Sequence, residues 1–183
     1  MSTSPACLFK MELLKRLVDV GEVSYKENAR IASVLDDKAQ RTSTISGVFL
    51  AAGFAALKPE TLAKLSGPVM LSLLSMVVAL LMLSVGACLV ALWARRNPPP
   101  LSVADISSIA GDILALPEDR ITPEVQTRVY LDQGRIWSAC VAEQDKVNAT
   151  KARLLKVAQV ALALAILTAG MFLAVLFKRA LLG

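Results

Sequence analysis

Hydrophobic residues in this chain are gathered into three blocks, which charged stretches separate. The longest block, residues 68–94, contains no charged side chain and is followed by two arginines. The last block, residues 157–177, has Gln159 and Thr168 as its only strongly polar members and is bracketed by basic residues. A helix of about 20 apolar residues crosses the hydrocarbon core of a bilayer. Both blocks therefore predict membrane-spanning helices.

The first block, residues 42–57, is shorter than a usual span. Its 16 residues precede Lys58 and are too apolar for a solvated helix. A buried helix of a soluble domain is the alternative. We favour a short span, because Lys58 and Lys64 extend their charged ends to the interface and local thinning of the bilayer absorbs the mismatch. Residues 57–68 are then expected to form a tight external turn.

Lysine and arginine counts predict the orientation of these spans. With the N-terminus inside, seven cations precede the first span and nine lie between the second and the third, so 16 of the 20 are cytoplasmic. The inverted arrangement would place those 16 outside, against the positive-inside rule. We therefore expect a cytoplasmic N-terminus and an external C-terminus.

The polar stretches between the blocks also have helical patterns. Residues 6–20 carry apolar side chains at a helical period, and a second helix is predicted to begin after Gly21 and to enter the first span. A capping pattern predicts a short helix over residues 102–115. Thr122 as N-cap, Pro123 at the first helical position and an acid after it predict the start of a helix that runs to Phe177.

The chain is thus expected to be an all-α integral membrane protein with three transmembrane helices, the first of them short, and long cytoplasmic helical extensions. Its regions are cytoplasmic amphipathic helices at 1–41, a transmembrane hairpin at 42–94 with spans at 42–57 and 68–94, a cytoplasmic helical region at 95–154, and a third transmembrane helix with a short external tail at 155–183.

Composition agrees with a membrane protein and argues against an enzyme. Apolar residues make up 55% of the 183 and charged residues 19%, which is too apolar for an ordinary soluble domain. There is no His, and the three Cys form no paired pattern, so the commonest general base and a disulfide framework are both missing. Phosphate-loop, dinucleotide and zinc-protease motifs are absent from the sequence. We expect no catalytic set, no metal and no cofactor.

The net charge of +5 does not indicate nucleic acid as a partner, because the cations flank apolar blocks, where anionic lipid and topology favour them. The lipid bilayer is the expected partner. The three spans carry no Asp, Glu, Lys or Arg, whereas pumps and ion-coupled transporters place such groups at membrane depth. A pore would therefore have to be assembled from several copies, or the protein would disturb the bilayer directly, and a homo-oligomer is expected.

Small residues recur at a spacing of four in the predicted spans, and such stripes let helices approach closely in lipid. We expect these residues to lie at helix contacts, within one chain or between chains. They are Ser43, Gly47, Ala51 and Ala55 in the first span, Ser75 and Ala79 and then Ala87 and Ala91 in the second, and Ala161, Ala165 and Ala169 in the third.

The order of these elements has a known counterpart. Residues 34–40, Val-Leu-Asp-Asp-Lys-Ala-Gln, lead into a short apolar segment and a two-span hairpin, and a charged helix with Gln144, Lys151 and Leu154-Leu155 then enters another span. In this layout, over residues 22–177, the chain resembles the transmembrane effectors of bacterial Pycsar antiphage systems and the related SLATT modules. At the level of single residues, the resemblance is confined to Asp37-Lys38-Ala39 and the region of Lys151.

The resemblance implies a resting protein of the bacterial inner membrane that responds to a cyclic nucleotide made during infection. It would then oligomerise or rearrange, break membrane integrity and stop growth of the infected cell. We see no separate nucleotide-binding domain, so either the cytoplasmic helices or a nucleotide-sensing partner would detect the signal.

Cytoplasmic cations are the candidates for holding a phosphodiester, because an arginine fork binds two phosphate oxygens at once. The alternative is that they only set topology and solvate helix faces. Two other functions stay open, a structural or scaffolding membrane subunit and a holin-like toxin independent of any nucleotide. The candidate ligand residues are Lys38, Arg41, Arg120, Arg128 and Arg135.

Overall fold

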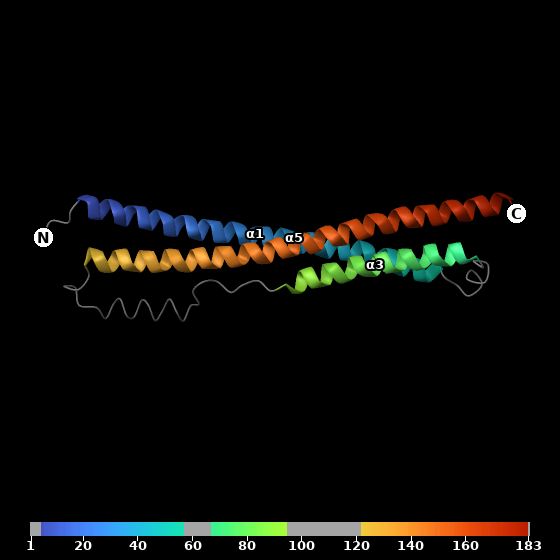
Figure 1. Cartoon of the computed structure of the whole chain (residues 1–183), viewed down its shortest axis with the longest axis horizontal. Coiled ribbons are helices and arrows are strands. Elements are labelled where there is room, and N and C mark those ends of the chain that lie inside the picture. Colours follow the sequence, from blue (N-terminus) through green and yellow to red (C-terminus); the bar gives the residue numbers. More distant parts are fainter. Residues whose placement is uncertain (1–4, 57–66, 95–121, 183) are drawn as a thin grey trace. The chain divides into compact units, whose positions relative to one another are not determined.

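The computed structural model describes residues 5–56, 67–94 and 122–182, and every regular element in these ranges is an α-helix. The helices are α1 (Pro5–Ala56), α3 (Pro68–Trp93) and α5 (Pro123–Leu182) (Figure 1). The expected all-helical fold class is confirmed for this part of the chain. The predicted helix at 102–115 and the predicted turn at 57–68 fall outside the described residues, except for the last two positions of the turn.

The predicted start of the last helix is confirmed. Its first backbone bond runs from the N–H of Gln126 to the carbonyl of Thr122, at 3.2 Å. Proline fits at the first helical position because its missing N–H would have no partner there. The Thr122 hydroxyl differs from the expected cap, since it donates to the Glu124 carboxylate at 3.4 Å.

The predicted helix boundary at Gly21 is wrong, because α1 continues through it without a break. Glycine inside a helix costs only about 1 kcal/mol relative to alanine, and Gly21 has no positive φ that would end the helix. Its lack of a side chain serves packing instead. A Cβ at Gly21 would lie 2.8 Å from the Cβ of Trp137 on α5.

Contacts divide the chain into two units, and both α1 and α5 contribute to each. Unit 1 comprises Met1–Ala32 and Arg96–Asn148, and unit 2 comprises Ser33–Arg95 and Ala149–Gly183. In the described part of unit 1, α1 and α5 lie side by side and run in the same direction. Gly21 and Tyr25 meet Trp137, with the two aromatic rings edge to face at 5.6 Å, and Asn28 meets Asn148 further along both helices.

Unit 2 packs three helices, with α1 and α5 parallel and α3 antiparallel to both (Figure 1). Its core is built almost entirely from small side chains, so the helices approach closely. On α5 the buried positions follow spacings of three and four, as in coiled coils. The core residues are Ala39 of α1, Ala87, Cys88 and Ala91 of α3, and Leu155 and Ala158 of α5.

A hydrogen bond between two serines joins α1 to α3 in unit 2. The Ser46 and Ser84 hydroxyl oxygens are 2.9 Å apart and both residues are fully buried. Ser46 also donates to the carbonyl of Thr42, four residues earlier. Ser84 can therefore donate to Ser46, which leaves neither buried hydroxyl without a partner.

Two of the helices are long and apolar enough to cross a membrane. They are α3, and α5 over Pro123–Lys178, and only 17% of the most apolar window of each is buried within the protein. The apolar end of α1 is not among these candidates, which were sought in the described residues alone. Most residues of these two apolar windows are thus free to contact a surrounding solvent.

Candidate functional site

A buried ion pair between α1 and α5 is the most unusual polar feature of unit 2. The Lys151 ammonium lies 2.6 Å from Oδ1 of Asp36, and the exposed fractions of the two side chains are 2% and 22%. Leu35, next to Asp36, and Leu154, three residues after Lys151, pack on the small-residue core. A fully buried lysine is rare and needs a charged partner. The side of α5 that carries Lys151 can therefore pack against α1 only while Asp36 faces Lys151.

The pair contributes specificity more than stability. Removing two charges from water costs about as much as their attraction returns, whereas removing only one partner leaves an uncompensated buried charge. A polar pair in an otherwise apolar helix contact most often fixes register. Here the small core side chains would tolerate a shift of α1 along α5, and the Asp36–Lys151 contact selects one register.

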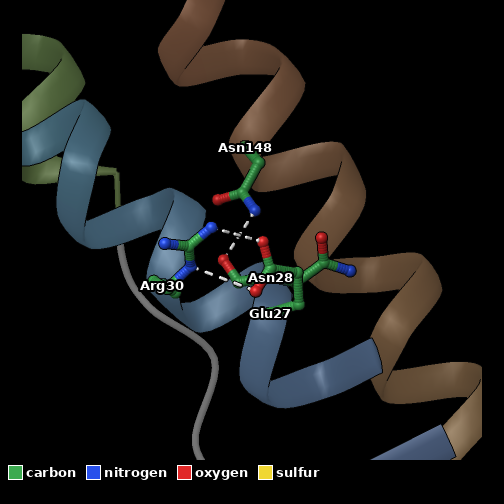
Figure 2. Close-up of polar contacts among 4 residues, drawn as sticks. All are labelled: Glu27, Asn28, Arg30 and Asn148. Atoms are coloured by element: carbon green, nitrogen blue, oxygen red, sulfur yellow. Dashed lines mark hydrogen bonds and ion pairs between the residues drawn. The ribbon is translucent and has the colours of Figure 1, made fainter. Parts of the chain in front are cut away.

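Unit 1 has its own buried polar group on α5. Figure 2 shows the Asn148 side chain reaching from α5 toward α1, where its amide nitrogen donates to the Asn28 backbone carbonyl at 2.9 Å. Gln144, one turn earlier, donates to the Asn148 side-chain oxygen at 3.5 Å, and both residues are buried. Asn148 also begins an Asn-Ala-Thr sequon, but this occupied amide is not accessible for glycosylation in the folded protein.

An exposed ion pair accompanies this contact on α1. Arg30 donates two hydrogen bonds to the Glu27 carboxylate, at 2.9 and 3.1 Å (Figure 2). The hydrogen bond from Arg30 lowers the pKa of Glu27, and the same bond raises the pKa of Arg30. Fully exposed pairs of this kind contribute little to stability. The Glu27 carboxylate offsets the charge of Arg30 locally.

The candidate ligand cations are distributed over both units. Lys38 and Arg41 lie three residues apart on α1 in unit 2, and Arg128 and Arg135 lie seven apart on α5 in unit 1; all four are exposed. The Arg135 guanidinium is 3.9 Å from Asp132. Residues at these spacings share a helix face. The structure therefore gives two pairs of cations, and Arg120 falls outside the described residues.

A groove of about 750 Å³ lies between α1 and α5 in unit 1. Its walls are mainly aliphatic, with Leu17 and Val20 more than half exposed. Arg135 is the one candidate cation in its lining, and Asp145 lines it as well. This groove could accept an apolar group that carries a charge at its edge.

The small-residue positions predicted for helix contacts have two different environments. Ala161 and Ala165 are buried in unit 2 and Ala169 is half-buried, whereas Ala51, Ala55, Ser75 and Ala79 are exposed. Gly47 is half-buried, and a Cβ added there would meet nothing within 4 Å. Strict spacing of four turns a set gradually around a helix of about 3.6 residues per turn. Ala87 and Ala91 of α3, also four apart, are buried, and the buried residues Ala39, Thr42 and Ser46 of α1 combine spacings of three and four.

Sequence reasoning did not find the partnership of Asp36 and Lys151. A signal was present on α5, where Lys151 stands in one stripe with Gln144 and Asn148 before it and Leu155 and Ala158 after it. A lysine in the buried stripe of a helix requires a carboxylate opposite. The choice between Asp36 and Asp37 depended on the rotation of α1, which apolar periodicity alone did not define.

Comparison of the chain with protein-family models, with curated proteins and with solved structures gives no match. Within the described ranges, no group of three or more Cys, Asp or Glu side chains could hold a metal ion. The function is therefore argued from the geometry of the two units.

Proposed function

We propose that the chain is a non-enzymatic membrane effector of a bacterial antiphage system, with three membrane-crossing helices and a cytoplasmic N-terminus. Support for a crossing by the first span, in addition to α3 and α5, comes from the end of α1. This segment hydrogen-bonds to the apolar helix α3 through Ser46 and Ser84 and leaves large apolar side chains uncovered. Val48 is 63% exposed and Phe54 is 60% exposed. Hydrocarbon is the solvent that accepts such a surface.

The observation that carries the proposal is the buried Asp36–Lys151 pair beside a core of small side chains. Lipid is as apolar as leucine, so helices in a membrane are held by close packing and by polar contacts. In the bundle of unit 2, the Asp36–Lys151 pair is a strong polar contact between α1 and α5, and it lies where the apolar stretches of these helices meet their charged parts. A signal that separates Asp36 from Lys151 would release the parallel helices and let the spans rearrange or oligomerise.

The cations supply a route for such a signal. Lys38 and Arg41 follow Asp36 within two turns of α1, so a phosphodiester held there would place negative charge near the pair and compete for Lys151. Arg128 and Arg135 of unit 1 offer a second binding surface, and Arg135 lines the groove. In this mechanism the cyclic nucleotide acts on the chain itself or on a partner that binds the same cations.

Membrane potential tests this function directly. Cells expressing the protein should keep their potential, and cells that also express a nucleotide cyclase should depolarise. Arg128→Ala combined with Arg135→Ala should abolish the response, because the phosphate of the nucleotide then has neither guanidinium group to bind. Isothermal titration against a panel of cyclic nucleotides should show the matching loss of binding. An unaltered response in this variant would reject these two residues as ligands.

The same assay separates the alternatives. Depolarisation without the cyclase would indicate a holin-like toxin, and a steady potential with the cyclase would indicate a scaffolding subunit. The groove of unit 1 favours the scaffolding alternative as second candidate, because its exposed leucines and valines are suited to a partner helix.

Three spans place the two ends of the chain on opposite sides of the membrane. In a background with Cys88→Ser and Cys140→Ser, an impermeant maleimide applied to spheroplasts should label Gly183→Cys and leave Cys7 unlabelled. Permeabilisation should expose Cys7. Labelling of both positions before permeabilisation would contradict three spans, and it would leave the two apolar helices α3 and α5 as the only crossings.

A further inference from the structure

A second feature of unit 2 lies on its outer surface, between α3 and α5. A crevice of about 310 Å³ is lined there by Leu80 and Leu83 of α3 and by an aliphatic strip on α5. Ala161 is buried, while Leu83, Val160 and Leu164 are each about half exposed. An elongated apolar group could therefore lie between the two helices and cover side chains that the protein leaves open.

One end of the crevice is charged. Lys156 is the first lining residue of α5, and Leu164 at the other end is about 12 Å further along the helix axis. Arg153, three residues before Lys156, shares its face, and both are exposed. Neither makes an ion pair with a residue of the described ranges. The nearest lysine in sequence, Lys151, is already paired with Asp36.

The sequence of α5 keeps this end basic. After Asp145 the helix has no Asp or Glu, and from Val157 to Phe177 it has no charge at all. Along α5, the cluster of basic residues thus ends at Lys156, where the crevice begins. A molecule that fits this order needs a negative head and an apolar tail, which is the chemistry of an anionic phospholipid.

We infer that unit 2 binds one anionic phospholipid, with its phosphate at Lys156 and Arg153 and one acyl chain in the crevice between α3 and α5. This inference rests on the proposed insertion of α3 and α5 into the membrane, and it is independent of the nucleotide signal. The lipid would bridge two helices that are otherwise joined by small side chains. It would thereby stabilise the resting bundle from the outside, as the Asp36–Lys151 pair does from within.

Native mass spectrometry of the full chain tests the site. The sample is the protein in detergent with equal amounts of phosphatidylglycerol and phosphatidylcholine of the same acyl chains. The measured quantity is the lipid that stays bound after the detergent is removed. Wild type should retain phosphatidylglycerol in preference. Lys156→Gln should lower that preference roughly fivefold, the effect of one interfacial lysine on anionic lipid. Lys156→Arg should keep it, and the matched control Lys178→Gln, at the other end of the apolar stretch, should also keep it.

The acyl chain has its own test. Val160→Trp fills the crevice and should reduce the retention of both lipids, while helical circular dichroism shows that the variant remains folded. Equal effects of Lys156→Gln and Lys178→Gln would overturn the site. Binding of the soluble headgroup glycerophosphoglycerol as tight as that of the whole lipid would also overturn it, because the crevice would then contribute nothing.

Failure of this inference is distinguishable from failure of the membrane proposal. A chain that stays monodisperse without detergent rejects membrane insertion and the lipid site together. A chain that requires detergent yet retains the two lipids equally rejects the lipid site alone.

Discussion

Asp36→Asn is expected to destabilise the bundle of unit 2 by about 3–5 kcal/mol, because it leaves the Lys151 ammonium buried without a counter-charge. Lys151 is 2% exposed and lies 2.6 Å from the carboxylate that this substitution neutralises. Thermal unfolding in mild detergent, followed by circular dichroism, measures the loss. Asp37→Asn is the matched control, since Asp37 is exposed on the same helix turn and exposed sites change stability by about 0.5 kcal/mol or less.

The double variant Asp36→Asn with Lys151→Met separates lost attraction from a stranded charge. Replacement of both members of a buried pair by groups without charge is often neutral, so most of the stability should return. If the pair also holds the resting state, Asp36→Asn alone should depolarise cells without any cyclase. Equal stability of the Asp36→Asn and Asp37→Asn variants would show that the pair does not form in the folded protein.

Gly21→Ala is expected to destabilise unit 1, although alanine is the better helix former. The new Cβ would lie 2.8 Å from the Cβ of Trp137, an atom next to the α5 backbone that cannot rotate away. Overpacking of this kind costs about 1–3 kcal/mol, and the gain in helix propensity returns only about 0.5–1 kcal/mol. The net change should therefore be a loss.

Gly134→Ala on α5 is the matched control, because nothing lies within 4 Å of a Cβ at that position. It should raise stability by about 0.5–1 kcal/mol, the intrinsic difference between the two residues in a helix. Fluorescence of Trp137 during denaturation, in a Trp93→Phe background, reports on unit 1 for both variants. Shifts of the same sign for Gly21→Ala and Gly134→Ala would contradict the close contact.

Local chemistry was sufficient to predict the extent of α3 and the start of α5. The apolar block from Pro68 predicted α3 nearly to its last residue, and the Thr122-Pro123 pattern predicted the first residue of α5. Gly21 was misread because its effect on α1 depended on a distant residue. A glycine that admits a tryptophan from another helix has the same local sequence signal as a glycine that weakens a helix.

Which faces of the helices meet could be predicted only in part. Ala161 and Ala165 are buried, yet Ala51 and Ala55 are exposed, and Ala39 and Cys88 carry the contact instead. Because alanine is abundant, several faces of a membrane helix can pack equally closely against another helix. The face that is chosen depends on polar partners, Ser46 with Ser84 and Asp36 with Lys151, and their pairing is a property of three helices together.

If the chain lies in a membrane as proposed, the small buried side chains of unit 2, which are alanine, serine and cysteine, have a consequence for crowding. Contacts between such small side chains lose little attraction when the same helix of a neighbouring molecule takes the place of the molecule's own helix. Exchange between the two helices therefore costs little free energy. Mass action then governs which partner is found. At low density each molecule would close on itself, and above a threshold number per membrane area the same contacts would join molecules to one another, so the proposed resting state requires that ordinary expression stays below that threshold.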